Sequence, residues 1–222
     1  MDYSVFDIIG PRMVGPSSSH TAGAARLGKV ARRISGNDVA QVTFTLYGSF
    51  AKTYKGHGTD RALLAGIMGM EPDDPNLSSS LELARSAGLV YEFAVSDAEP
   101  PHPNTVKMMI TGSGGKKTEV VGSSIGGGNI KVIQLNGLAI EFTGEYPTLV
   151  IRHLDRPGVI GDVTGLMGNF NINIAFMRVF RHSKGQDAFM ILETDNVIPK
   201  KVVSQVRALS DEIKDVYLIE AM

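Results

Sequence analysis

The sequence contains no cysteine, no long apolar stretch and no excess of charge of one sign. Without cysteine, the 222-residue chain can form no disulfide, use no thiol as a nucleophile and ligate no iron–sulfur cluster by itself. No apolar run reaches the roughly 18 residues that a membrane-spanning helix needs. Lys and Arg number 22 and Asp and Glu 23, for a net charge of -1, so we expect neither nucleic acid nor a membrane as a partner. The first residues lack a signal-peptide pattern, which predicts a cytoplasmic protein.

Hydrophobic residues make up 43% of the chain and charged residues 20%, as in a globular protein whose length allows two modest domains. In the first part, apolar residues with helical spacing predict helices at 19–34, 59–68 and 78–87. Short alternating or apolar runs predict strands at 42–47, 89–95, 106–111, 119–122, 130–135 and 139–143. Asn136-Gly137 is a strong hairpin signal. We therefore predict an α+β domain over residues 1–145 with a largely antiparallel sheet.

The element order changes after a plausible hinge at residues 144–147. Strands are expected at 149–153, 172–181, 187–194 and 216–221, and helices at 159–170 and 199–209. This βαββαβ order predicts a ferredoxin-like domain over residues 146–222. His153 and His182 are expected on its surface.

Residues 15–21 combine small and hydroxyl side chains directly before the first predicted helix. Free N–H groups and the positive end of a helix dipole favour a carboxylate at such a place. The hydroxyl-bearing residues are Ser17, Ser18, Ser19 and Thr21. The simpler interpretation is that Ser19 caps the helix and that the other hydroxyls are solvated.

Three of the five histidines, His20, His57 and His102, fall in predicted loops of the first domain. Loop histidines flanked by glycine, proline and small polar residues suit general acid–base chemistry. Zinc binding is the competing use, but the spacing matches no local zinc motif. The glycine-rich stretch 123–129 is either a turn or a loop whose backbone approaches a ligand.

The motifs Gly-Pro-Ser-Ser-Ser-His-Thr, Gly-His-Gly-Thr-Asp, His-Pro-Asn and Ser-Ile-Gly-Gly-Gly together resemble the beta chains of iron–sulfur-dependent L-serine dehydratases. The resemblance covers essentially the whole chain. Asp-Arg-Pro-Gly-Val-Ile-Gly-Asp-Val, followed by Asn-Ile-Asn-Ile-Ala from Asn171, resembles an ACT domain. The first domain is similar to the allosteric substrate-binding domain of some phosphoglycerate dehydrogenases.

The resemblance implies a lyase that converts L-serine to pyruvate and ammonia by β-elimination without pyridoxal phosphate. A [4Fe-4S] cluster, held by a separate alpha subunit, would bind the substrate hydroxyl as a Lewis acid. The absence of cysteine agrees with that division. The active site is then expected at the interface with the alpha subunit, and this chain alone is expected to be inactive.

The resemblance also implies roles for individual residues. His57 is the first choice for the base and His102 the second, and His20 would orient the carboxylate or transfer a proton. Ser17, Ser18, Ser19 and Thr21 would bind the carboxylate of L-serine. The remaining substrate-binding candidates are Thr59, Asp60, Asn104, Gly126, Gly127 and Gly128.

For the ACT-like domain, the resemblance implies a regulatory ligand, self-association, or both. The ligand candidates are Asp155, Gly158, Val159, Ile160 and Asn171. The alternative for the whole chain is a non-catalytic module that senses serine and regulates another enzyme of amino-acid metabolism. A sensor needs donors for the carboxylate and the amine but no base facing the α-carbon.

Overall fold

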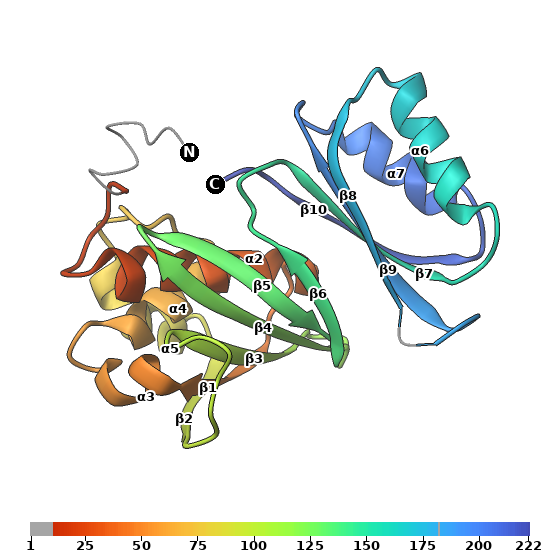
Figure 1. The fold of residues 1–222 in the computed structure, drawn as a ribbon. Helices are drawn as coiled ribbons and strands as arrows, with labels where there is room; N and C mark the ends of the chain where they lie inside the picture. Colours follow the sequence, from red (N-terminus) through yellow and green to blue (C-terminus); the bar gives the residue numbers. More distant parts are fainter. Residues whose placement is uncertain (1–10, 182) are drawn as a thin grey trace. The chain divides into compact units, whose positions relative to one another are not determined.

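The computed structural model describes residues 11–181 and 183–222. The chain divides into two compact units, Met1–Gly137 and Leu138–Met222 (Figure 1). The sequence pattern places this boundary a few residues later, after position 145. In the part of the chain that the structure describes, no helix is long and apolar enough to cross a membrane.

The first sheet has six strands in the order β2-β1-β3-β4-β5-β6. The strands are β1 (Gln41–Tyr47), β2 (Val90–Ser96), β3 (Thr105–Thr111), β4 (Lys117–Gly126), β5 (Asn129–Leu135) and β6 (Leu138–Phe142). β1 is parallel to β2 and antiparallel to β3, and the pairs β3–β4 and β4–β5 are antiparallel. The predicted α+β class and the largely antiparallel sheet are confirmed.

The helical segments of the first unit include the three predicted helices and one segment that the sequence did not indicate. The segments are η1 (Ser18–Ala22, a π-helical turn), α2 (Gly23–Ser35), α3 (Gly48–Thr53), α4 (Thr59–Met68), η2 (Leu77–Ser79) and α5 (Ser80–Ser86). The unexpected segment is α3, whereas η1 overlaps the start of the helix predicted at 19–34. Both α3 and η1 lie at the candidate site described below.

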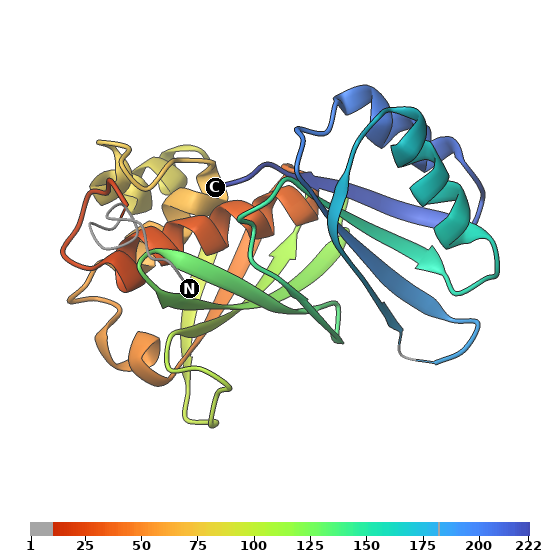
Figure 2. The ribbon, with the colours of Figure 1, turned by 45° about the horizontal axis from the view of Figure 1, so that its top comes forward.

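Helix α2 packs between the sheet and α4 (Figures 1 and 2). Its apolar face, which includes Leu27, Val30 and Ile34, is fully buried. Two glycines allow the backbones of α2 and α4 to touch: a Cβ on Gly66 would lie 2.0 Å from the carbonyl oxygen of Ala25, and one on Gly28 would lie 2.3 Å from that of Leu63. No larger residue fits at either position without moving the main chain.

The second unit contains a four-stranded antiparallel sheet in the order β10-β7-β9-β8. Its elements are β7 (Thr148–Leu154), α6 (Val159–Asn169), β8 (Ile174–Arg181), β9 (Asp187–Thr194), α7 (Lys200–Ala208) and β10 (Ile213–Ile219). α6 and α7 cover one face of this sheet (Figure 1). This is the predicted ferredoxin-like βαββαβ arrangement.

One expectation for this unit is wrong, because His153 is buried, with 1% of its surface exposed. β7 lies between β9 and β10, and His153 shares the strand face of Leu149 and Ile151, which pack into the core under the helices. Its Nδ1 lies 2.8 Å from the carbonyl oxygen of Leu154. His182 lies outside the described residues.

Candidate active site

Two histidines from separate segments of the chain meet in the first unit. His20 lies in η1, which leads into α2, and His57 lies in the turn before α4. Their ring centroids are 4.8 Å apart and the rings are tilted by 41°. The contact between α2 and α4 therefore brings together two of the three histidines that the sequence singles out.

Hydroxyl groups bind both ring nitrogens of His20. Nδ1 lies 3.3 Å from Oγ of Ser17, and Nε2 lies 3.1 Å from Oγ of Ser49. The edge of the ring also contacts Phe50, with the centroids 5.3 Å apart. Burial, and then the neighbouring His57, lower the pKa of His20, so the neutral ring is favoured.

The start of the first helix differs from the expectation in two respects. The residue that caps it is Ser17 rather than Ser19, because Oγ of Ser17 accepts the backbone N–H of His20 at 3.2 Å. His20 consequently lies in the first helical turn and not in a loop. Within the described residues, the hydroxyls of Ser18 and Ser19 have no hydrogen-bond partner, which leaves them available to a ligand.

Unpartnered buried atoms mark the start of α4. Nδ1 of His57 and Oγ1 of Thr59 are buried and have no hydrogen-bond partner. Oγ1 of Thr21 donates to the carbonyl oxygen of His57 at 3.4 Å, which ties this turn to η1. Asp60 accepts the backbone N–H of Arg61 at 2.8 Å. Buried polar atoms without partners are rare in folded proteins, so these two atoms call for a partner that the described residues do not supply, such as a ligand or an ordered water.

His102 has a defined tautomer. Its Nδ1 accepts the backbone N–H of Asn104 at 3.2 Å, so the neutral ring carries its proton on Nε2. Among the described residues, the side chain of His102 contacts neither His20 nor His57. The loop of His102 is connected to His20 through Ser49, whose N–H donates to the carbonyl oxygen of Pro103 at 2.7 Å and whose hydroxyl contacts His20.

Ser49 belongs to this site although no sequence motif marks it. It follows Gly48, which has a φ of +54°, directly after β1. A glycine-serine pair at the end of a strand is a signal for a turn, but it does not indicate which side chain the serine binds. Asn104 directly follows Pro103, and its carbonyl oxygen accepts a hydrogen bond from the N–H of Ser124 at 3.0 Å.

The glycine-rich stretch forms a tight hairpin turn between β4 and β5, in which Gly126 pairs with Asn129. Gly126, Gly127 and Gly128 all have positive φ. The carbonyl oxygen of Gly128 accepts Nη1 of Arg26 in α2 at 2.8 Å. The structure therefore has the turn that the sequence left open as one of two possibilities, and a role of these glycines in binding substrate stays a prediction.

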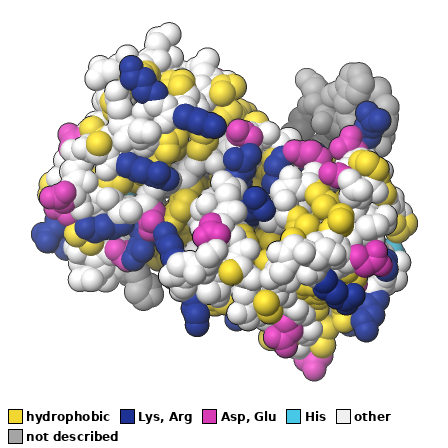
Figure 3. Space-filling model, turned by 180° about the vertical axis from the view of Figure 1, so that it is seen from behind, with side chains coloured by type: hydrophobic (Ala, Val, Ile, Leu, Met, Phe, Trp, Pro, Cys, Tyr) yellow, Lys and Arg dark blue, Asp and Glu magenta, His cyan; other side chains and the backbone are white. Residues whose placement is uncertain are grey.

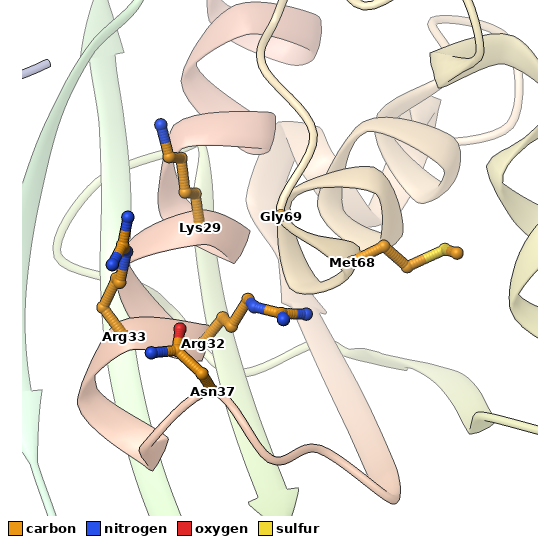
Figure 4. A pocket seen from close by; sticks show the side chains of 6 residues that line it. All are labelled: Lys29, Arg32, Arg33, Asn37, Met68 and Gly69. Carbon is orange, nitrogen blue, oxygen red and sulfur yellow. The ribbon is translucent and has the colours of Figure 1, made fainter. Parts of the chain in front are cut away.

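A cavity of about 340 Å³ lies at the opposite end of α2 from His20 (Figure 4). Its lining residues are Lys29, Arg32, Arg33, Asn37, Met68 and Gly69. Arg32 donates to the carbonyl oxygen of Ile67 at 2.9 Å, and Lys29 forms an ion pair with Glu71. The contact of Arg32 places a cation at the C-terminal end of α4, where the helix dipole is negative, and Lys29 is paired with a carboxylate, so the local structure accounts for both contacts.

A second cavity, of about 470 Å³, lies beside the loop that carries His102. Its walls come from β1, β3, β4, β5 and residues 99–101. Oγ1 of Thr105, in its wall, donates to the carbonyl oxygen of His102 at 2.6 Å.

Basic and acidic side chains are interspersed on the face drawn in Figure 3, with no large patch of one sign.

In the second unit, Asp155 is held by the turn between β8 and β9. It accepts Nη1 of Arg181 at 2.8 Å and the N–H of Gly185 at 3.2 Å, and the Gly185 bond, followed by that of Arg181, lowers the pKa of its carboxyl group. Gly158, with a φ of +96°, precedes α6, whereas Asn171 follows its C-terminal end. An 11-residue helix is about 16 Å long, so these candidates do not share one small site within a single copy.

Comparison with known proteins agrees with this architecture. Residues 4–87 match the family model of the serine dehydratase beta chain, and residues 148–211 match that of the ACT domain. Together with the two folds, these matches define a two-unit protein in which a dehydratase beta-chain domain is followed by an ACT domain.

Two relatives of similar length show to which family the chain belongs. The chain is 43% identical to a probable L-serine dehydratase beta chain of Bacillus subtilis, over 95% of this chain and 96% of that protein. It is 44% identical to the L-serine dehydratase beta chain of Peptoniphilus asaccharolyticus, over 92% and 93%. The chain belongs to the family of L-serine dehydratase beta chains, as its motifs predicted. A D-3-phosphoglycerate dehydrogenase of Bacillus subtilis is 30% identical over 89% of this chain but only 37% of that enzyme.

Proposed function

We propose that this chain is the beta subunit of an L-serine dehydratase, a lyase that forms pyruvate and ammonia from L-serine. The observation that carries the proposal is the sequence identity of 43–44% with two such beta chains, over nearly the full length of this chain and of each relative. In the proposed β-elimination, L-serine loses its α-proton and its hydroxyl group, and the resulting aminoacrylate tautomerises and is hydrolysed.

The [4Fe-4S] cluster of this reaction does not fit this chain. The sequence has no cysteine, and the described residues contain no group of three or more His, Asp or Glu side chains that could hold a metal ion. We assign the cluster to a separate alpha subunit, with no pyridoxal phosphate, and place the active site where the two subunits meet. This chain then supplies groups that bind the substrate and move its protons.

The start of the first helix is the proposed site for the substrate carboxylate. Ser18 and Ser19 have unpartnered hydroxyls there, whereas Ser17 is already occupied as the cap. Hydroxyl and backbone N–H donors at a helix start stabilise a carboxylate and also the negative charge that develops next to it when the α-proton leaves.

Different hydrogen bonds suggest different roles for the histidines. His57 is the proposed base, because neither ring nitrogen is hydrogen-bonded among the described residues and Nε2 is not among the buried unpartnered atoms. His102 is the proposed hydrogen-bond donor to the substrate, because its Nδ1 is occupied and its Nε2 carries the proton. The lowered pKa of His20 favours its neutral form, which would limit the positive charge beside His57.

The ACT domain is the proposed regulatory and self-association unit. Its ligand would bind at the turn from Asp155 to Ile160, where Gly158 presents an open backbone with nothing within 4 Å of a Cβ position. Asn171, at the far end of α6, could join such a site only from a second copy.

Anaerobic pyruvate formation from L-serine tests the proposal, measured with this chain alone, with the cluster-loaded alpha subunit alone, and with both. Activity is expected only when both subunits are present. If the pair is inactive although the cluster is intact and L-serine binds to this chain, the enzymatic role is wrong and a serine-sensing role is favoured. Activity of the alpha subunit alone would also contradict the proposal.

A further inference from the structure

We infer that Ser49 is a positioning residue of the proposed reaction, because its hydroxyl holds Nε2 of His20 in place beside His57. The inference rests on the proposed function. Nothing in the sequence motifs marks Ser49, since it lies eight residues before His57 in a stretch that carries none of them. Its assignment comes from the 3.1 Å contact between Oγ of Ser49 and Nε2 of His20.

Hydrogen bonds to both main-chain polar groups of Ser49, the N–H and the carbonyl oxygen, fix its position. Its N–H donates to the carbonyl oxygen of Pro103 at 2.7 Å, and its own carbonyl oxygen accepts Oγ1 of Thr53 at 2.8 Å. Gly48 has a φ of +54°, and a Cβ there would lie 2.5 Å from the carbonyl oxygen of Pro103. Only glycine allows this close approach, so the backbone at Gly48 holds Ser49 in one position.

A hydroxyl on each nitrogen limits the rotation of the His20 ring. Rotation about the Cβ–Cγ bond moves both ring nitrogens, so a turned ring loses the contact with Ser17 and the contact with Ser49 together. Each hydroxyl can donate or accept, so the pair accommodates a neutral ring in a fixed orientation. In metal sites, residues that orient a ligating histidine affect metal affinity or activity by about 10- to 100-fold, and we expect a similar effect on activity for the orientation of His20.

Ser49 also connects the histidines. Its side chain binds His20, which contacts His57, and its N–H binds the residue that follows His102. The Pro103 contact uses only the backbone of Ser49, so it survives replacement of the side chain. Substitution of the hydroxyl therefore changes the orientation of His20 without releasing the loop of His102.

The test uses the assembled enzyme with Ser49→Ala, Ser49→Thr and the control Ser35→Ala. Ser35 is also half-buried, but its hydroxyl binds the carbonyl oxygen of Arg32, at the other end of α2. We expect Ser49→Ala to lower kcat about 10-fold or more with KM within about twofold, and Ser49→Thr to restore most of kcat. Ser35→Ala is expected to keep the activity of the wild type.

A second measurement does not depend on activity. The ¹⁵N chemical shifts of the His20 ring nitrogens, recorded on the full chain by itself, report its tautomer. Ser49→Ala is expected to shift them, and Ser49→Thr and Ser35→Ala are expected to leave them unchanged. Unchanged shifts in Ser49→Ala would overturn the inference even if the paired subunits proved to have another activity. Changed shifts with an unchanged kcat would also overturn it, whereas inactivity of the wild-type pair would contradict the proposed function instead.

Discussion

The ring centroids of His20 and His57 lie 4.8 Å apart, with the rings tilted by 41°, although the two residues belong to different segments of the chain. Burial, and then the charge of the neighbouring His57, lower the pKa of His20, so this contact disfavours the charged form of His20.

Replacing His57 is expected to raise the pKa of His20. The charge of His57 lowers the pKa of His20, and His57→Ala removes this effect. Burial, the larger cause, remains, so the pKa of His20 in the variant is expected to stay below the ordinary value of histidine. NMR titration of the His20 ring in both proteins measures the change. An unchanged or lower pKa would show that the two rings are not coupled.

His57 and His102 are expected to affect catalysis differently. In the assembled enzyme, His57→Ala should lower kcat by about 10²-fold, because a general base contributes about that much. His102→Ala should mainly raise KM, by roughly fivefold or more, because it removes a hydrogen bond to the substrate. Steady-state kinetics of both variants test the assignment. The opposite pattern, with kcat lost in His102→Ala and retained in His57→Ala, would exchange the two roles.

The three serines before the first helix are expected to separate into a structural and a substrate-binding group. Ser17→Ala removes the cap and one partner of His20, so it should cost about 1 kcal/mol of unfolding free energy. Ser18→Ala and Ser19→Ala should change stability by less than about 0.5 kcal/mol and should instead weaken L-serine binding roughly fivefold. Denaturant titrations and substrate binding to the assembled enzyme measure the two effects. Normal affinity in both of the last variants would favour the capping interpretation of this segment.

The contact between α2 and α4 predicts opposite effects for two glycine substitutions. Gly66→Ala should destabilise the protein by about 1–3 kcal/mol, because the new methyl group would overlap the carbonyl oxygen of Ala25. Gly165→Ala, in the interior of α6 and with nothing within 4 Å, should stabilise it by about 0.5–1 kcal/mol. Thermal unfolding of each variant shows whether its stability rises or falls relative to the wild type. A stable Gly66→Ala protein would mean that the two helices can separate at little cost.

Glu193, 4% exposed in β9, predicts a pH dependence of stability. Burial raises the pKa of its carboxyl group, and Arg178 opposes that shift only in part. As pH rises from the ordinary carboxyl pKa through this raised value, the unfolded chain ionises first, so the folded state loses stability. Glu193→Gln should therefore raise the melting temperature at pH 7 but not at pH 4. A lower melting temperature at pH 7 would show that the ion pair with Arg178 outweighs the cost of burial.

The sequence predicted helix α4 with its observed ends, since Gly58 and Gly69 flank it and both adopt positive φ. It predicted the ferredoxin-like order of the second unit equally well, because hydrophobic periodicity and turn residues are local signals. Helix α3 was missed because its six residues are too few for a periodic pattern. A contact with Pro103, more than 50 residues away, holds its first turn in place.

The histidines of the candidate site were found from their neighbours in sequence, but their contacts were not. The pairing of His20 with Ser49 and His57 depends on how α2, α3 and α4 pack, which no local pattern encodes. The capping residue was also misassigned, since Ser17, Ser18 and Ser19 are chemically equivalent candidates. His153 was misplaced because a polar residue near the end of a strand is usually exposed, whereas β7 is a central strand.

The glycines at the crossing of α2 and α4 have a consequence for the spacing of the histidine pair. His20 and His57 each lie just before one of these helices, so the distance between the rings depends on how the two helix axes are placed. Because peptide groups rather than side chains meet at Gly28 and Gly66, no side chain at this crossing can change its rotamer to accommodate extra volume. A larger residue at either glycine would therefore move the helix axes and, with them, the two imidazoles.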